Sequence, residues 1–255
     1  MAQFTRHKHI YNGVYMSIFT HLEYISVLAN NATTESDSGH FTDIDVLKKY
    51  ADNEVDTVIF GGPIRCYSKF QITPRDVTYG DEEHTFRIAC LKEELRELND
   101  AINENDIRET IDALVDLLIF AIGTSYRVGS VFRSMFAYKN HATSVGYLIH
   151  QHAKNLNLSP VKAAHHVAEG FVNDLQHMDH RHYLAYQNKI DQIIATVLTF
   201  LLNEFDREMI LEYYERVTQA NLSKELGSLP KRGSFSIDLK KPEGWKAPSF
   251  EGLLN

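Results

Sequence analysis

Carboxylates recur at helical spacing in the central part of this 255-residue chain. Glu93, Glu94 and Glu97 lie in a stretch whose apolar residues are spaced by three and four, which predicts an amphipathic helix. At about 100° per residue, Glu94 and Glu97 occupy neighbouring positions on one face. Two or three carboxylates therefore border a helix face that must pack against another element.

A second acidic stripe follows in a much more apolar segment. Between Ile111 and Ile122 the polar residues are Asp112 and Asp116, and Glu109 lies one turn before Asp112. We expect a helix this apolar to be buried nearly all round. Buried carboxylates are costly unless protonation, a cationic partner or a metal ion neutralises them. A hard divalent cation such as Mg²⁺ prefers oxygen ligands and fits this stripe.

These carboxylates also have structural interpretations. Glu93 and Glu97 are compatible with a solvated helix face, and Asp106-x-x-Glu109 resembles a capping box in which Glu109 only caps the helix. For the two aspartates of the second stripe, the alternative is a buried ion pair with Lys or Arg. A di-iron carboxylate site is disfavoured, because no Glu in the chain is followed by His three residues later.

Two helices must position these stripes. The first is predicted from the spacing of Ile88, Leu91, Leu95, Leu98 and Ile102. Polar residues 103–106 interrupt the pattern, and a second helix is predicted from Asp106 to about Tyr126. Because the connection is short, we expect the two helices to be antiparallel.

The N-terminal third is less regular. Helical spacing predicts a helix over residues 14–29, and a short helix is predicted at Asp43–Tyr50. Val55–Phe60 is followed by Gly61-Gly62-Pro63. This apolar run is compatible with a strand, a buried turn or the edge of a loop.

The C-terminal half is predicted to be helical up to a polar tail. Met135–Phe205 is predicted to form further helices, one of which begins at Ser159-Pro160. Another helix covers roughly Arg207–Ala220, and an ordered, non-helical tail follows Asn221. A cluster of histidines, His177, His180 and His182, is interpreted as solvated rather than as a metal site.

Charge and hydropathy exclude several classes of protein. The formal net charge is −8, and no dense cluster of Lys and Arg is present. Proteins that grip nucleic-acid backbones use such clusters to displace counterions, so we expect no nucleic-acid partner. The apolar runs are too short or too polar to span a bilayer, so we expect no membrane partner. Two cysteines and an N-terminal stretch without an apolar signal region are typical of a cytoplasmic protein.

The acidic stripes resemble a known family. The run Glu94-x-x-Glu97, a short hairpin and then Glu109-Thr-Ile-Asp112-Ala-Leu-Val-Asp116-Leu-Leu is similar to the all-α nucleoside triphosphate pyrophosphohydrolase superfamily. That superfamily includes MazG-like enzymes, dimeric dUTPases and phosphoribosyl-ATP pyrophosphohydrolases. The tail, with Asn221-Leu-Ser-Lys224 and a later Lys-Lys-Pro-Glu-Gly-Trp run, adds a second similarity in the expected order.

The resemblance implies a mainly all-α fold. It would be a MazG-like helical bundle with extra N-terminal and inserted helical segments and a non-helical C-terminal tail. We expect residues 1–255 to form a single elaborated domain. Its core segments would be 84–129 and 206–254, with 1–83 as an N-terminal extension and 130–205 as a helical insertion.

The resemblance also implies a reaction and a set of site residues. We expect Mg²⁺, for which Mn²⁺ can substitute, and hydrolysis of a nucleoside triphosphate, with a deoxynucleotide favoured, in a homodimer or homotetramer. The implied metal ligands are Glu94, Glu97, Glu109, Asp112 and Asp116. Glu93 or Glu97 would orient or deprotonate the attacking water, and Asn221 and Lys224 would bind the substrate.

One departure from the family pattern concerns the second helix. Many members place Glu three residues before the aspartate that precedes the Leu-Leu pair, and here that position is Ala113. Asp112 or Glu109 would take over its role. The competing interpretation is a non-catalytic helical binding or regulatory protein whose acidic stripes are ion-paired. Adding Mg²⁺ distinguishes the enzyme from the binding protein. An enzyme with a metal site should be stabilised by Mg²⁺, because a ligand that binds only the folded state stabilises that state.

Overall fold

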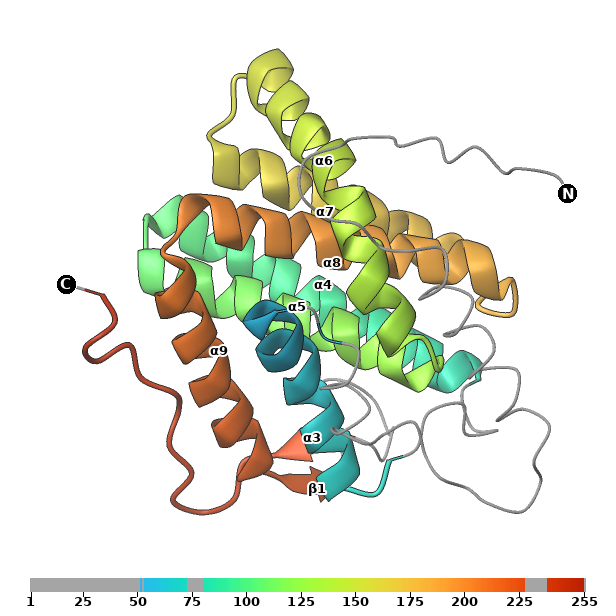
Figure 1. The fold of residues 1–255 in the computed structure, drawn as a ribbon, viewed down its shortest axis with the longest axis vertical. Helices are drawn as coiled ribbons and strands as arrows, with labels where there is room; N and C mark the ends of the chain where they lie inside the picture. The colour runs from blue at the N-terminus through green and yellow to red at the C-terminus, as the bar shows by residue number, and fades with distance from the viewer. Residues whose placement is uncertain (1–50, 52, 73–79, 228–237, 255) are drawn as a thin grey trace, which may run out of the picture. The chain divides into compact units, whose positions relative to one another are not determined.

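The computed structural model describes residues 51, 53–72, 80–227 and 238–254. Within these ranges the chain forms seven α-helices and one pair of short strands (Figure 1), so the prediction of an all-α fold is confirmed. The helices predicted over residues 14–29 and at Asp43–Tyr50 lie outside the described residues.

The predicted acidic hairpin is the pair α4 (Asp81–Glu104) and α5 (Ile107–Arg127). Asn105 ends α4 in the left-handed conformation, with φ of 56°, which asparagine tolerates better than most residues. Asp106 then caps α5: its Oδ1 accepts from the backbone N–H groups of Arg108 and Glu109 at 2.9 and 3.2 Å. Both helices, and their tight antiparallel connection, are confirmed.

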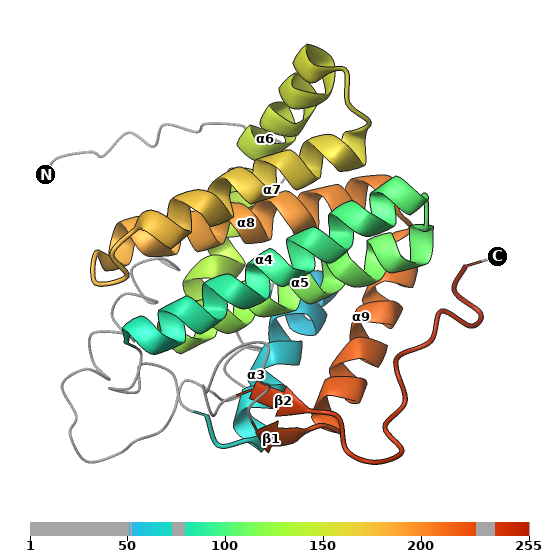
Figure 2. The same cartoon turned by 180° about the vertical axis from the view of Figure 1, so that it is seen from behind.

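Three long helices form the layer against which the hairpin packs. They are α6 (Val131–Leu156), α7 (Pro160–His177) and α8 (Tyr183–Glu204). Helix α4 packs on α7 and α5 packs on α8, while α6 covers α7 and α8 (Figure 2). The helical character predicted for 130–205 is confirmed, including the Ser159 cap and the first-turn proline of α7.

The segment Val55–Phe60 is helical, so none of the three predicted alternatives is right. Asp56–Phe60 forms a π-helical turn, η1, which continues directly into α3 (Gly61–Lys69). Pro63 has no N–H and cannot bond the Ile59 carbonyl four residues earlier. That carbonyl accepts instead from the hydroxyl of Tyr214, 155 positions away, at 2.8 Å.

Helix α9 (Arg207–Leu222) packs against α3. The contact is close because Gly62 has no side chain: a Cβ there would lie 2.6 Å from Thr218 Oγ1 and 2.8 Å from Tyr214 Cε1. This packing brings the C-terminal end of α9, where Asn221 lies, next to α3. Residues from the two ends of the described chain are therefore available to a single site.

The tail after α9 is non-helical where the structure describes it, as predicted. Strands β1 (Glu225–Gly227) and β2 (Asp238–Lys240) pair antiparallel, and residues 241–254 then return along α9 (Figure 1). Phe250 stacks on Tyr213 at 3.7 Å between ring centroids, and Trp245 Nε1 donates to the Ala220 carbonyl at 3.0 Å. These two aromatic contacts fix the tail to α9.

The apolar face of each hairpin helix is buried in the core. Leu91 and Leu98 of α4, and Ile111 and Leu118 of α5, have no exposed surface. No helix in the described ranges combines the length and the apolar character needed to cross a bilayer.

Candidate active site

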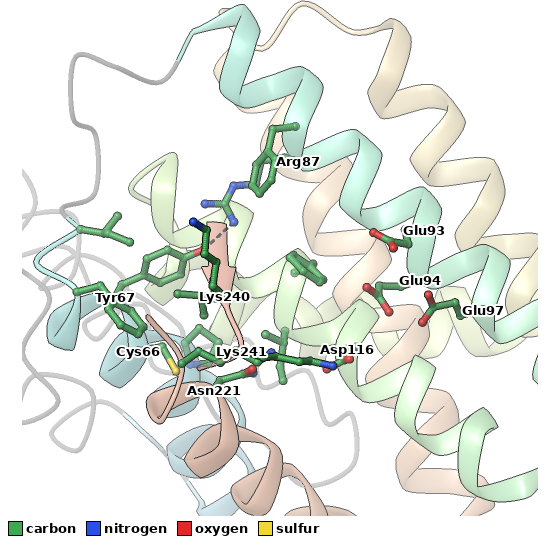
Figure 3. Close-up of a pocket in the computed structure, with 18 residues that line it drawn as sticks. Cys66, Tyr67, Arg87, Glu93, Glu94, Glu97, Asp116, Asn221, Lys240 and Lys241 are labelled. Atoms are coloured by element: carbon green, nitrogen blue, oxygen red, sulfur yellow. Dashed lines mark hydrogen bonds between the residues drawn. The ribbon is translucent and has the colours of Figure 1, made fainter. Parts of the chain in front are cut away.

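A pocket of about 600 Å³ opens between α3, α4, α5, the end of α9 and strand β2. Its lining includes four carboxylates, three lysines, one arginine and several aromatic rings (Figure 3). The chain therefore brings together residues from position 63 to position 241. No single segment of the sequence contains the whole site.

One wall of the pocket is acidic. Helix α4 contributes Glu93, Glu94 and Glu97, and α5 contributes Asp116 from across the hairpin. Glu94 is only 3% exposed, whereas the Glu97 side chain is 49% exposed. The two predicted stripes thus meet at the pocket, with carboxylate oxygens at several depths.

Asp112 and Glu109 continue the stripe of α5 but do not line the pocket. The Asp112 carboxylate accepts from the Tyr213 hydroxyl at 2.5 Å, and burial together with this hydrogen bond raises the pKa of Tyr213. Glu109 is exposed, and partial desolvation and the charge of Asp112 raise its pKa. Its side chain makes no reciprocal capping bond, so Asp106 caps α5 alone.

Helix α5 is buried around most of its circumference, as predicted, but its two aspartates are not fully buried. Asp112 and Asp116 are both half-buried. Asp116 lines the pocket, and Asp112 accepts a hydrogen bond from Tyr213 of α9. The expectation of a buried carboxylate pair is corrected to a pair at the border of the core.

The donor set fits a hard cation by type, since carboxylate oxygens are the ligands that Mg²⁺ prefers. Among the described residues, no three His, Cys, Asp or Glu side chains are gathered closely enough to form a ready metal site. Glu94, Glu97 and Asp116 share one pocket without converging on one point. These residues could hold a divalent ion only together with its waters or with ligand oxygens.

The wall formed by α9 and the tail is polar and cationic. Asn221, 7% exposed, and Lys224 both line the pocket, and their predicted contact with substrate stays a prediction. Lys241, directly after β2, lines this wall too, whereas Lys240 of β2 lies beside Tyr67 and Arg87 (Figure 3). The Trp245 ring lies 5.3 Å from the Lys224 ammonium and 4.5 Å from that of Lys241, so it holds both cations by cation–π contact.

The remaining wall is mainly aromatic and was not predicted from the sequence. Phe70, Phe86 and Phe120 line it together with Tyr67 and Arg87. Arg87 lies nearly two helical turns before Glu93. From the sequence alone, an arginine at such a position on an amphipathic helix cannot be told from one that is exposed to solvent. Its proximity to Tyr67 depends on how α3 packs on the hairpin, and no local pattern indicates that packing.

Of the three clustered histidines, His177 and His182 are exposed as predicted, whereas the His180 side chain is only 11% exposed, so the interpretation as solvated is wrong for His180. His180 stacks on His84 at 5.5 Å between ring centroids, and its Nδ1 lies 3.7 Å from Asp81 Oδ1. His84 Nδ1 lies 2.9 Å from the Tyr186 hydroxyl. The rings therefore join the start of α4 to the α7–α8 connection, and neither lines the pocket.

The hairpin of α4 and α5 lies within a segment that matches a known protein family. Residues 69–136 match the family model of phosphoribosyl-ATP pyrophosphohydrolase. The resemblance to the all-α pyrophosphohydrolase superfamily is confirmed. No curated protein and no solved structure matches the chain. The matched range contains all of α4 and α5, hence every carboxylate of the pyrophosphohydrolase motif that lines the pocket.

The match supports a nucleotide pyrophosphohydrolase of the MazG-like superfamily. It ends at residue 136, so it does not cover the part of the pocket lining that α9 and the tail contribute. The residues that complete this pocket, Asn221 and the lysines of the tail, lie more than 80 positions beyond the matched range.

Proposed function

We propose that this chain hydrolyses a deoxynucleoside triphosphate to the monophosphate and pyrophosphate, with Mg²⁺ as the metal ion. The observation that carries the proposal is the arrangement of charge in one pocket. Carboxylates of α4 and α5 face lysines and an asparagine of α9 and the tail. A triphosphate with its metal ion needs both kinds of group at close range.

The acidic wall would hold the metal ion. Glu94, Glu97 and Asp116 offer oxygens from two helices whose relative position is fixed by the buried hairpin interface. Asp112 and Glu109 would act from the adjoining turns, Asp112 oriented by its bond to Tyr213. When bound, Mg²⁺ polarises phosphoryl oxygens and lowers the pKa of an attacking water.

Glu93 and Glu97 are the candidates for the group that accepts a proton from the attacking water. Both line the pocket at the mouth of the acidic wall, and Glu97 is the more exposed. A carboxylate with access to solvent can pass an accepted proton on to bulk water. The buried Glu94 is better suited to fixed coordination than to proton exchange.

The cationic wall would bind the phosphates. Lys224 and Lys241 are held in place by the Trp245 ring, so little side-chain entropy is lost when they contact an anion. Asn221, at the C-terminal end of α9, can donate from its amide to a phosphate or sugar oxygen. The tail thereby completes a site that the hairpin alone leaves open.

The direct experiment is a screen of ribo- and deoxynucleoside triphosphates with MgCl₂, with products separated by ion-exchange chromatography. We expect equal amounts of monophosphate and pyrophosphate, and faster turnover of the deoxy series. Stepwise release of inorganic phosphate with a diphosphate intermediate would contradict the proposal.

A further inference from the structure

The pocket has two chemically different ends. Figure 3 shows Glu93, Glu94 and Glu97 together on one side, while Arg87 and Tyr67 meet on the other. If the metal ion and the triphosphate occupy the acidic end, the nucleobase extends toward Arg87 and Tyr67. The aromatic rings of Phe70, Phe86 and Phe120 suit a flat base, and the polar atoms among them decide which base.

Arg87 is a buried donor at this end. The residue is 2% exposed; its Nη1 donates to the Tyr67 hydroxyl at 2.6 Å and its Nη2 to Glu83 Oε1 at 3.2 Å. Within the described part of the chain, its Nε has no acceptor. A guanidinium has no lone pair to offer and does not deprotonate in proteins, so Arg87 can only donate.

The Tyr67 hydroxyl is a second donor. It accepts from Arg87, and no acceptor for its own proton is found in the described ranges. Burial raises the pKa of Tyr67, so the hydroxyl stays protonated at neutral pH. The ring is fixed by stacking on Tyr126 at 4.7 Å and 7°, and Gly123 leaves the space for it, since a Cβ there would lie 2.6 Å from the hydroxyl oxygen.

Two further polar side chains at this end, those of Lys240 and Cys66, are donors as well. Lys240 lines the same end with an ammonium group. Burial raises the pKa of Cys66 to about 11, which keeps its thiol protonated and leaves it a weak donor. The carboxylate nearest to Arg87, Glu83, is fully buried and does not line the pocket, because Arg87 and Arg127 occupy its oxygens.

We infer that this end of the pocket binds the nucleobase and selects bases that present a carbonyl oxygen, namely 6-oxopurines and 4-oxopyrimidines. This inference rests on the proposed function. Guanine carries O6 and N7 acceptors, and uracil and thymine carry O4, whereas adenine and cytosine place an amino donor at the same position. An amino group of the base that faces Arg87 and Tyr67 finds only donors there. The amino N–H and the protein's N–H and O–H groups would then all be buried without acceptors.

The preference is measured as kcat/KM. Leaving a buried polar group unpaired costs enough to reduce binding about tenfold to a hundredfold. We therefore expect dGTP, dITP, dUTP or dTTP to exceed dATP and dCTP by about that factor. The purine and pyrimidine arms show which ring the aromatic wall accepts. Equal or higher kcat/KM for dATP or dCTP would overturn the inference.

A pair of matched variants assigns the preference to this end. Tyr67→Phe removes one hydroxyl and keeps the stacked ring, so the oxo-to-amino ratio should fall about tenfold, mainly through a higher KM for oxo substrates. Tyr126→Phe is the control, because its hydroxyl bonds the Ile72 carbonyl and does not line the pocket. It should keep the wild-type ratio. Thermal melts of both variants establish that each is folded at the assay temperature.

The two proposals fail in different ways. If no triphosphate yields pyrophosphate, the proposed function is wrong and the inference falls with it. If pyrophosphate is released from amino and oxo bases alike, the proposed function stands and the inference is overturned. An unchanged ratio in folded Tyr67→Phe would also overturn it.

Discussion

Helical carboxylates occur in two settings in this protein. Asp56, Glu83 and Asp191 have no exposed surface, and each has protein partners. Asp56 accepts from Lys139 at 2.7 Å, and Glu83 binds two arginines. These groups connect helices: Asp56 joins η1 to α6, and Glu83 joins α4 to the end of α5.

The pocket carboxylates differ in what surrounds them. Glu93, Glu97 and Asp116 are partly exposed, and together with Glu94 they line one pocket opposite lysines of the tail. Spacing along a helix is similar in both settings, so it does not separate structural from functional carboxylates. The difference lies in whether the fold places a buried protein partner or an open pocket next to the carboxylate. The free energy of unfolding should therefore respond oppositely to loss of charge in the two settings.

The largest expected effect is on the structural side. Glu83→Gln removes the charge that Arg87 and Arg127 share and leaves two buried guanidinium groups without their carboxylate. Breaking a buried pair costs about 3–5 kcal/mol of unfolding free energy. Urea unfolding followed by circular dichroism measures this loss. A change below about 1 kcal/mol would show that the network does not stabilise the hairpin.

On the functional side, Asp116→Asn should reduce kcat by about 10²–10³, because it removes charge from the wall that would hold the metal ion. The unfolding free energy without metal should stay level or rise, since a carboxylate next to Asp112 is neutralised. Product assays and urea unfolding on the same preparation measure both. Strong destabilisation with unchanged activity would place Asp116 in the same class as Glu83.

A smaller effect is expected in the tail. Lys224→Ala removes one cation that faces the acidic wall, so KM should rise about tenfold with little change in stability, in keeping with the loss of one charged hydrogen bond. Lys246→Ala is the matched control, because Lys246 is exposed and does not line the pocket. Equal KM in the two variants would contradict a substrate contact at Lys224.

The smallest expected effect is a change in the alkylation rate of Cys66. This thiol lines the pocket, so its reactivity can be followed without changing the charge of the pocket. Burial raises the pKa of its thiol to about 11, so the reactive thiolate is scarce at pH 8 and increases as the pH approaches that value. Alkylation by iodoacetamide, followed by peptide mass spectrometry, should therefore be slow at pH 8, and bound nucleotide should slow it further. Rapid alkylation at pH 8 that nucleotide does not affect would contradict this placement.

The hairpin was predictable because its signals are local. Apolar spacing defines α4 and α5, and the Asn105–Asp106 connection carries its own termination and capping residues. The π-helical turn at Asp56–Phe60 was not predictable, because a β-branched run before Gly-Gly-Pro favours a strand or a turn. One of its carbonyls, that of Ile59, accepts from the Tyr214 hydroxyl of α9, a long-range contact that no local pattern indicates.

The same division applies to the site. The acidic wall follows from carboxylates one turn apart on two predicted helices, and the family match contains all of it. Arg87, Tyr67 and Lys240 belong to three separate elements, and only tertiary packing brings them together. The roles of Lys224 and Asn221 were implied by resemblance, whereas the Trp245 contact that positions Lys224 is visible only in the structure.

The central claim is that the pocket carboxylates bind a divalent metal ion, while Asp56, Glu83 and Asp191 do not. Thermal melts of wild type and Asp116→Asn, each with EDTA or with MgCl₂, test it most directly. Because a ligand that binds the folded state stabilises it, Mg²⁺ should raise the melting temperature of the wild type and leave that of Asp116→Asn unchanged. A wild type indifferent to Mg²⁺, together with a strongly destabilised Asp116→Asn in EDTA, would contradict the account.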